Sequence, residues 1–262
     1  MFRIWDAGRE AVEDFDMKRP SVMVCVPAYG QNVCAQTMES LFKLAQFLTL
    51  NQIRHQLSWY SAADIVEVRN LFITSWYDCH PQFSHMLFID ADMGFEPELI
   101  RDMLAFDKPL TGAFYARRQM PPSVVGAAFD KDHSFPDIVQ GHLRAAYVGA
   151  GVMLIKRSMV KELLEKKPEL IDALPSVLAN ATPLPLTRLL RVFDCILEDN
   201  RRLSEDISFC QRWHDCGGEI WANVMHKIDH VGPFNFHLRY GGIMEKKWNE
   251  WNAEEAKKAD AA

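Results

Sequence analysis

The sequence lacks a long apolar run and an excess of basic residues, and each absence excludes a class of protein. No apolar run approaches the roughly 20 residues that a transmembrane helix requires. Lys and Arg number 29 against 35 Asp and Glu, which gives a net charge of −6. Because binding along a nucleic acid requires clustered basic side chains, this balance argues against a nucleic-acid-binding surface.

Closely spaced cysteines are also missing. The six cysteines are scattered and none of them forms a CxxC pair. This spacing is typical of reduced core thiols rather than of a disulfide framework or a zinc site. The N-terminal segment MFRIWDAGREAVEDFD has early acidic residues and no apolar core, so we expect no signal peptide. Together these features predict a cytoplasmic protein.

The sequence does contain enough apolar material for one large domain. Hydrophobic residues make up 48% of the 262 residues. Neither an internal repeat nor a low-complexity tract divides the chain, and the composition is that of an ordinary globular protein.

Apolar segments of strand length alternate with segments of helical periodicity through the first half of the chain. The expected strands cover residues 21–26, 55–60, 85–89 and 110–115, and the expected helices cover residues 32–50, a segment with Ile65, Val68, Phe72 and Trp76 on one face, and a segment that begins at Pro97. This alternation predicts an α/β fold with a doubly wound, mainly parallel sheet. Ligands bind outside the carboxyl ends of such strands, so Pro27-Ala28-Tyr29 and Asp90-Ala91-Asp92 should face one cleft.

The second half of the chain is less regular, and we expect it to form the irregular part of the same domain. Gly149-Ala150-Gly151 interrupts the pattern before an apolar strand, and Ser158 is a candidate cap for the helix that follows. Residues 166–190 contain four prolines, which favour an excursion or a mobile loop. Ser204 should cap a later helix, which stops at Gly217-Gly218.

Asp90 and Asp92 follow the clearest buried strand. Residues i and i+2 of an extended backbone point to the same side, so the two carboxylates converge. A divalent cation such as Mg²⁺ or Mn²⁺ would compensate their charge and could bridge a diphosphate. The alternative is that Asp90 only ends the strand and Asp92 only caps the next turn.

A phosphatase could use the same two residues. Haloacid-dehalogenase-like phosphatases place Asp-x-Asp after a hydrophobic strand, with the first Asp as nucleophile. Their motif normally continues with Thr or Val and sits on the first strand. Here Met93 and Gly94 follow, a third of the way along the chain. The phosphatase hypothesis is therefore the weaker one, but it can be tested.

Two further positions could carry chemistry. Ser204-Glu205-Asp206 fits an N-cap with acidic residues in the first helical turn, and it fits equally well a general base that deprotonates a hydroxyl group. A lone His is more often structural than a ligand. Beside a carboxylate pair, however, the imidazole of His230 could complete the coordination of Mn²⁺.

Basic residues near the expected cleft are candidates for binding phosphate. Arg117 and Arg118 come just after the fourth expected strand and are well placed for this. Arg69, in the first turns of its helix, could be an ordinary surface arginine. His237 and Arg239 could contact phosphates from a mobile C-terminal loop.

Small and aromatic residues give two more candidates. Gly149-Ala150-Gly151 could be only a tight turn, or it could let a sugar approach the backbone closely. Tyr29, after Pro27, could stack on a nucleobase.

The chain resembles GT-A glycosyltransferases close to family two in an ordered set of segments. These segments are VMVCVPAYG, VRN, FIDADM, GAGVMLIKRS, LSEDISFCQRW and DHVG, and they span roughly residues 21–232. The resemblance implies a single GT-A domain over residues 1–262. Residues 1–115 would form its nucleotide-binding half, residues 116–245 its acceptor and metal half, and residues 246–262 a polar tail.

The resemblance also implies roles for individual residues. Pro27, Ala28 and Tyr29 would contact the base and ribose of a sugar nucleotide, helped by Arg69. Within Asp90-Ala91-Asp92, Asp92 would bind Mn²⁺ or Mg²⁺ directly, and Asp90 would face the ribose or the water shell of the metal.

On the acceptor side the resemblance implies three further roles. His230 matches the metal-binding histidine of the family. Asp206, the second residue of the pair with Glu205, corresponds to the catalytic base of inverting members. Gly149-Ala150-Gly151 would border the donor sugar and the acceptor, with Arg117 nearby.

The chain departs from the family in two places. Residues 166–190 are longer than the segment that many members place before the Glu-Asp motif, so the resemblance does not extend to acceptor geometry. Gln211-Arg212-Trp213 lacks the spacing of the QxxRW motif of processive synthases. We therefore do not expect synthesis of a long polymer.

These observations predict a metal-dependent glycosyltransferase that transfers a sugar from a UDP-sugar to the hydroxyl of an unknown acceptor, with inversion. Two other classes stay open. One is a regulatory protein that binds a sugar nucleotide without transferring the sugar. The other is the phosphatase in which Asp90 is the nucleophile.

Overall fold

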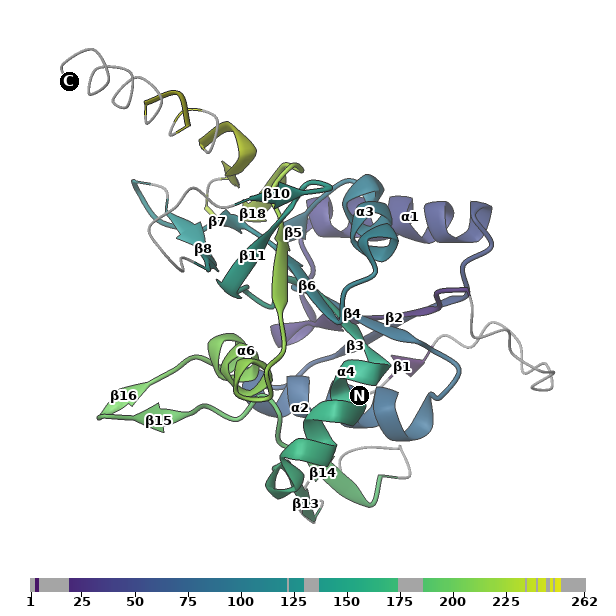
Figure 1. Cartoon of the computed structure of the whole chain (residues 1–262). Helices are drawn as coiled ribbons and strands as arrows, with labels where there is room; N and C mark the ends of the chain where they lie inside the picture. Colours follow the sequence, from purple (N-terminus) through teal and green to yellow (C-terminus); the bar gives the residue numbers. More distant parts are fainter. Residues whose placement is uncertain are drawn as a thin grey trace.

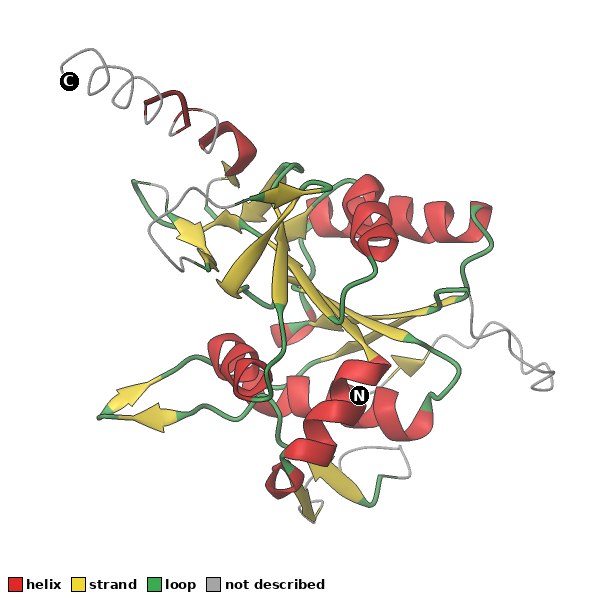
Figure 2. Cartoon of the chain, in the orientation of Figure 1, coloured by secondary structure: helices red, strands yellow, loops and turns green. Residues whose placement is uncertain are grey.

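A large mixed sheet covered by helices on both faces forms the centre of the molecule (Figure 1, Figure 2). The computed structural model describes residues 3–4, 19–121, 123–129, 137–173, 186–233, 235–238, 240–243, 246 and 248–250. The α/β class expected from the alternation of strands and helices is confirmed.

The order of the strands explains how the two halves of the chain combine. In spatial order the sheet contains β1 (Arg3–Ile4), β3 (His55–Tyr60), β2 (Val22–Pro27), β4 (His85–Ile89), β12 (Val152–Lys156), β6 (Leu110–Ala113), β17 (Ile220–Asn223), β11 (His142–Tyr147) and β10 (Ile138–Val139), and β9 (Ala127–Ala128) pairs with β11. β2 is parallel to β3 and β4, and β6 is parallel to β17. β12 runs antiparallel between β4 and β6. The carboxyl ends of β2, β3, β4, β6 and β17 therefore lie at one edge of the sheet.

Four small sheets surround the large one. They consist of β19 (Asn235–Leu238), β18 (Ile228–Val231) and β5 (Met93–Gly94); β7 (Tyr115–Ala116) with β8 (Val124–Val125); β13 (Ile171–Ala173) with β14 (Arg188–Leu190); and β15 (Leu197–Glu198) with β16 (Arg201–Arg202). In the first of them His230 stands opposite Met93, the residue after Asp92. This pairing brings the C-terminal part of the chain to the end of β4.

The helices divide between the two faces of the sheet (Figure 1). α1 (Ala35–Leu50) and α3 (Pro97–Phe106) lie on one face, and α2 (Ile65–Cys79), α4 (Arg157–Lys166) and α6 (Glu205–Asp215) lie on the other. Because successive side chains of a strand point to opposite faces, β4 contributes to two cores. Met86 and Phe88 belong to the core beneath α2, whereas Leu87 and Ile89 belong to the core beneath α1 and α3.

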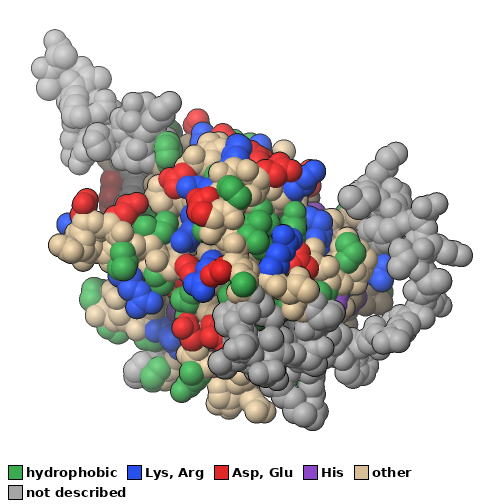
Figure 3. Space-filling model, turned by 90° about the horizontal axis from the view of Figure 1, so that it is seen from below, with side chains coloured by type: hydrophobic (Ala, Val, Ile, Leu, Met, Phe, Trp, Pro, Cys, Tyr) green, Lys and Arg blue, Asp and Glu red, His purple; other side chains and the backbone are tan. Residues whose placement is uncertain are grey.

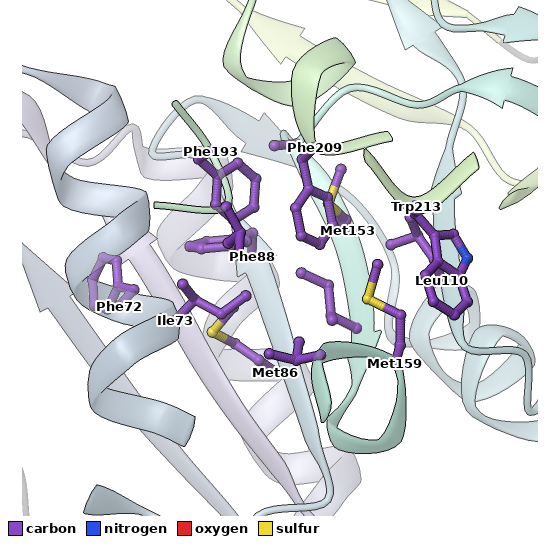
Figure 4. Packing of buried hydrophobic residues seen from close by; sticks show 14 of the residues in the cluster. Phe72, Ile73, Met86, Phe88, Leu110, Met153, Met159, Phe193, Phe209 and Trp213 are labelled. Carbon is purple, nitrogen blue, oxygen red and sulfur yellow. The ribbon is translucent and has the colours of Figure 1, made fainter. Parts of the chain in front are cut away.

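Aromatic packing in the first of these cores fixes α6 relative to β4 (Figure 4). Phe88 contacts Phe72 of α2 with ring centroids 6.1 Å apart, and it contacts Phe193 edge to face at 5.5 Å. Phe193 in turn stacks on Phe209 of α6 at 4.4 Å. Large apolar side chains of this kind contribute most of the burial energy of a core. The start of α6 is thereby held beside the carboxyl end of β4.

Some local expectations require correction. The strand expected over residues 110–115 ends at Ala113, and Tyr115–Ala116 forms the separate strand β7, which pairs with β8. The N–H of Phe114 still donates to the carbonyl of Asn223 in β17 (3.3 Å). Ser158 does not cap α4, because the helix already begins at Arg157 and Lys156 occupies the N-cap position.

The structure describes the two ends of the proline-bearing segment. Its two ends form the β13–β14 pair, preceded by a single 3-10 turn, η2 (Pro168–Leu170). Residues 174–185, with the other three prolines, lie outside the described residues, as do Arg239 and most of the expected polar tail.

Two findings bear on the environment of the chain. In the part of the chain that the structure describes, no helix is long and apolar enough to cross a membrane. All six cysteines are described, and each is a free thiol.

Candidate functional site

The candidate site lies at the carboxyl end of β4, where the chain turns through Asp90-Ala91-Asp92 into β5. The N–H of Asp90 donates to the carbonyl of Gly151 (3.0 Å), and the carbonyl of Asp90 accepts from Met93 (3.2 Å). The N–H of Val231 donates to the carbonyl of Asp92 (2.8 Å). Backbone bonds from three separate segments thus fix the turn that carries both carboxylates.

Arg69 connects this turn to α6. It lies in the second turn of α2, a helix whose N-cap is Asp64, and the Asp64 side chain accepts from the N–H of Val66 (2.9 Å). Its guanidinium donates to Asp90 (Nη2 to Oδ1, 2.9 Å) and to Glu205 (Nε to Oε1, 3.4 Å). Arg69 is only 2% exposed. It is therefore a buried bridge between two candidate site residues, and not the surface arginine that the sequence also allowed.

The guanidinium of Arg69 stays charged, and one of its hydrogen-bond donors is unsatisfied within the described part of the chain. Burial lowers its pKa, but the charges of Asp90 and Glu205 outweigh this, and the pKa lies above its ordinary value. Its Nη1 is buried and has no hydrogen-bond partner among the described residues. Because an unsatisfied buried donor costs roughly 1–3 kcal/mol, an acceptor supplied by a ligand would be favoured here.

Asp92 and His230 meet across the β5–β18 pairing. Nε2 of His230 lies 3.6 Å from Oδ2 of Asp92, and Nη1 of Arg118 lies 2.9 Å from the same oxygen. The carboxylate of Asp92 is 22% exposed. Burial raises the pKa of Asp92, but the interactions with His230 and the charge of Arg118 lower it by more. The pKa of Asp92 therefore lies below its ordinary value. The carboxylate is therefore ionised at neutral pH.

The orientation of His230 suits a metal ligand. Its Nδ1 lies 2.8 Å from the carbonyl of Ala116, so Nδ1 carries the proton and donates it. Metal-binding histidines commonly make such a bond through one ring nitrogen, which leaves the other free for the ion. The ring of Tyr115 packs edge-on against the imidazole, with centroids 5.4 Å apart.

Asp92 and His230 together fit Mn²⁺ or Mg²⁺. The described residues contain no group of three or more His, Cys, Asp or Glu side chains arranged as a cage. Two protein ligands are nevertheless enough for ions that commonly take their other ligands from water and substrate phosphates. One carboxylate oxygen and one imidazole nitrogen are a donor set that borderline ions such as Mn²⁺ accept.

The start of α6 carries Glu205 and Asp206 in different settings. Glu205 is turned toward Arg69. The hydroxyl of Ser204 and the N–H of Ile207 (2.8 Å) both donate to Oδ1 of Asp206. Ser204 occupies the N-cap position but its side chain accepts no helix N–H. The expected cap is thus corrected, because the hydroxyl is used to hold the Asp206 carboxylate.

The three residues Gly149-Ala150-Gly151 are buried, and their small size is explained by Tyr115. The N–H of Gly151 donates to the Tyr115 hydroxyl (3.2 Å). A Cβ atom at Gly149 would lie 2.3 Å from that hydroxyl, and one at Gly151 would lie 2.7 Å from it. These contacts account for both glycines without a sugar.

Pro27, Ala28 and Tyr29 line a pocket at the carboxyl end of β2. The pocket has a volume of about 350 Å³, and the rest of its lining consists of Tyr60, Ala62, Ala63, Ile65 and Val68. Tyr29, in the short 3-10 helix η1 (Tyr29–Gln31), is 75% exposed, so its ring is free to contact a planar group.

A second hollow of about 590 Å³ adjoins the first. Its lining includes Arg202, Cys195, Ser204 and Glu205, and it shares Ala63 and Ile65 with the first pocket. Arg202, Cys195 and Tyr60 are pocket residues that sequence reasoning missed. They come from unrelated segments and carry no motif, so no sequence signal indicated them.

Two other candidates lie elsewhere. Nε of Arg117 donates to the carbonyl of Val124 (3.4 Å), and its side chain is exposed. His237 lies in β19, exposed and paired opposite Asp229, and not in the loop that we expected. No contact in the structure connects either side chain to Asp90 or Asp92.

Comparison with known proteins gives structural likenesses only. No protein-family model matches the chain, and no curated protein matches its sequence. Similar solved structures are A197 from STIV (TM-score 0.49, 14% identity, 84% of this chain and 91% of that chain), the S. aureus protein TarS, residues 1–349 (0.41, 13%, 83% and 59%), and the catalytic domain of Drosophila β1,4-galactosyltransferase 7 (0.37, 12%, 84% and 70%). At these scores the likenesses carry no argument about activity.

Proposed function

We propose that the chain is a metal-dependent GT-A glycosyltransferase that transfers a sugar from a UDP-sugar to an acceptor hydroxyl with inversion. The observation that carries this proposal is the approach of Asp92 to His230, 3.6 Å apart, with the other ring nitrogen of His230 bonded to a backbone carbonyl. A pocket lined by Pro27, Ala28 and Tyr29 lies at the end of the neighbouring strand β2 and would take the base.

Asp92 and His230 would hold Mn²⁺ or Mg²⁺ between the protein and the diphosphate. Such an ion would supply positive charge to the oxygens of the leaving UDP. Asp90 is tied to Arg69 and would face the ribose or the water shell of the ion. The spare Nη1 donor of Arg69 would be satisfied by an oxygen of the bound nucleotide.

Asp206 would be the general base. Its Oδ1 accepts from the Ser204 hydroxyl and the Ile207 N–H, which fixes the carboxylate. The carboxylate would take the proton of the acceptor hydroxyl as that oxygen attacks the anomeric carbon. Glu205 would act differently, by positioning Arg69.

Some parts of the proposal rest on sequence resemblance. These are the two functional halves, residues 1–115 and 116–245, and the sugar contacts of residues 149–151 and Arg117. The proposed cytoplasmic location rests instead on the scattered cysteines. The ordered motifs also resemble majastridin, a GT-A-fold protein encoded within a bacterial ATP synthase operon, and we extend the proposal to a relationship with that protein.

The phosphatase hypothesis receives no support from the surroundings of Asp90. Oδ1 of Asp90 is ion-paired with a buried arginine at 2.9 Å, which leaves only Oδ2 to act as a nucleophile. Release of phosphate from a generic phosphomonoester, without nucleotide, would nevertheless overturn the transferase proposal.

A thermal-shift screen of nucleoside diphosphates and their sugars, with and without Mn²⁺, tests the proposed ligand. We expect UDP and UDP-sugars to raise the unfolding temperature only when Mn²⁺ is present. The ion is needed to hold the diphosphate, and a ligand that binds the folded protein stabilises it. A shift from nucleotides that does not depend on the metal, or no shift at all, would contradict the proposal.

The Asp206→Asn variant tests the base. We expect it to lose sugar transfer, and also slow hydrolysis of the UDP-sugar, by about 100-fold or more while UDP binding is retained. The exposed Glu98→Gln variant is the control. Retained transfer would remove Asp206 from the role of base. Tight UDP binding by the wild type with neither transfer nor hydrolysis would instead indicate a regulatory nucleotide-binding protein.

A further inference from the structure

Arg118 contacts the candidate metal ligand Asp92, and the phosphate-binding role expected from the sequence does not explain this contact. Nη1 of Arg118 lies 2.9 Å from Oδ2 of Asp92 and 3.4 Å from the carbonyl of Val231. The same Asp92 oxygen faces Nε2 of His230 at 3.6 Å. The guanidinium is therefore bound at the oxygen that a divalent ion would use.

We propose that Arg118 competes with the divalent ion for Asp92 and, once displaced, binds the diphosphate of the donor. The inference rests on the proposed function and adds a second cation to it. A guanidinium within ion-pair distance of Asp92 would repel a divalent ion on the same oxygen, since like charges so close raise the energy of both. Ion binding therefore requires the Arg118 side chain to turn away.

The surroundings of Arg118 allow that movement. Its side chain is 49% exposed, so it can change rotamer without disturbing the core. Its backbone is fixed, because Arg117 N–H donates to the carbonyl of Ser123 (2.7 Å) and Gln119 N–H donates to the carbonyl of Arg117 (2.9 Å). Only the side chain moves.

A displaced Arg118 side chain would stay beside the diphosphate. Arg118 is two residues from Ala116, whose carbonyl holds His230 in place. The planar guanidinium fork matches the oxygens of a phosphate group and forms charge-assisted bonds with them. The residue would thus neutralise Asp92 before the metal and nucleotide bind, and would neutralise phosphate afterwards.

Two binding measurements on the Arg118→Gln variant test this role, because it predicts changes of opposite sign. Without nucleotide, removal of the competing cation should raise the affinity for Mn²⁺ about threefold or more, as expected for a partly exposed ion pair. With Mn²⁺ saturating, loss of the phosphate contact should lower the affinity for UDP about tenfold or more. Free Mn²⁺ measured by electron paramagnetic resonance gives the first value, and calorimetry gives the second.

The control is Arg101→Gln, which removes a similarly exposed arginine ion-paired with Asp102 at 2.8 Å on α3. It should change neither affinity. If Arg118→Gln weakens both affinities, its role is structural and the inference is wrong. An unchanged Mn²⁺ affinity, or an unchanged UDP affinity, would equally overturn it.

Failure of the inference and failure of the proposed function give different results. If wild-type protein binds UDP through Mn²⁺ and Asp92→Asn abolishes this, the metal and nucleotide site of the proposed function stands whatever Arg118→Gln does. If the wild type shows no Mn²⁺-dependent UDP binding, both proposals are rejected.

Discussion

At the scale of single residues, Tyr115 organises the centre of the candidate site. Its hydroxyl accepts from Gly151 N–H, and its ring packs against His230. Burial raises the pKa of its phenol well above the ordinary value, and the charges of Asp90 and Asp206 raise it further. The phenol is therefore neutral. Its hydroxyl holds Gly151, whose carbonyl in turn accepts from the N–H of Asp90.

The Gly149→Ala substitution should destabilise the protein by about 1–3 kcal/mol, because the added methyl group overpacks a buried contact. The new Cβ would lie 2.3 Å from the Tyr115 hydroxyl and 2.6 Å from Val125. Urea unfolding measures the loss. Gly242→Ala is the control, since nothing lies within 4 Å of its Cβ position.

A second variant distinguishes the Tyr115 contact from other causes. Tyr115→Phe removes the clashing oxygen, so the combined Tyr115→Phe, Gly149→Ala variant should lose less stability than the sum of the two single losses. Additive losses would show that the two residues do not interact and that the glycine is required for another reason.

Sequence reasoning named candidate site residues but did not describe their contacts. Asp90, Asp92 and His230 were found by motif, and the structure brings Asp92 and His230 together. Arg69 was compatible with a surface position, because its burial depends on how α2 packs against β4 and α6. The pairing of Arg118 with Asp92 is a tertiary contact, which no local pattern indicated.

At the scale of elements, Arg157 fastens the start of α4 to the end of α2. Its guanidinium donates to the carbonyls of Trp76 (2.8 Å), Tyr77 (2.9 Å), His80 (2.7 Å) and Phe83 (3.0 Å). It also lies over the Trp76 ring, 4.4 Å from the centroid. Trp76 and Tyr77 lie in the last turn of α2, and His80 and Phe83 follow the helix. A single side chain therefore adds hydrogen bonds to the helix end and to the segment after it.

Arg157→Lys should lower the free energy of unfolding by about 2–4 kcal/mol, because a lysine cannot reach all of these carbonyls with one ammonium group and leaves some without a partner. Denaturant unfolding gives the value. Lys161→Ala, an exposed change one turn later in α4, should stay within about 0.5 kcal/mol of the wild type. Equal effects of the two substitutions would show that the Arg157 contacts do not stabilise the fold.

Element boundaries could be predicted where local chemistry determines them. The strands over residues 55–60 and 85–89 match β3 and β4, and Pro97 stands at the first position of α3. β11 was missed, because its residues lack a regular apolar alternation and are held by pairing with β17, about 75 residues later in the chain. The antiparallel direction of β12 could not be predicted either, because it is determined by pairing with β4 and β6.

At the scale of the whole molecule, charge is spread and not concentrated. On the face that Figure 3 shows, Lys and Arg side chains are interspersed with Asp and Glu side chains. The pH dependence of stability should therefore come from individual buried groups. The clearest is His85, 6% exposed, at the end of β4 opposite the candidate site.

Burial, together with the charge of Lys156, lowers the pKa of His85 to about 4. In the unfolded chain the imidazole titrates near its ordinary value of 6.5. The unfolded state thus binds more protons between these values, so stability falls as the pH is lowered from about 6.5 toward 4. From pH 7 to pH 5 the loss should be about 2 kcal/mol.

Urea unfolding of the wild type and of His85→Gln at both pH values checks this. The variant should lose markedly less stability between pH 7 and pH 5, whatever its stability at pH 7. The same loss in both proteins would assign the acid sensitivity to other groups.

The central claim is that Asp92 and His230 hold a divalent ion that binds the diphosphate of UDP. Calorimetric titration of UDP into wild-type protein, Asp92→Asn and His230→Gln, each with Mn²⁺ and with EDTA, tests it most directly. We expect the UDP affinity in Mn²⁺ to fall at least about tenfold in both variants, while the three proteins bind UDP equally weakly in EDTA. An unchanged affinity in Mn²⁺ for either variant would contradict the account.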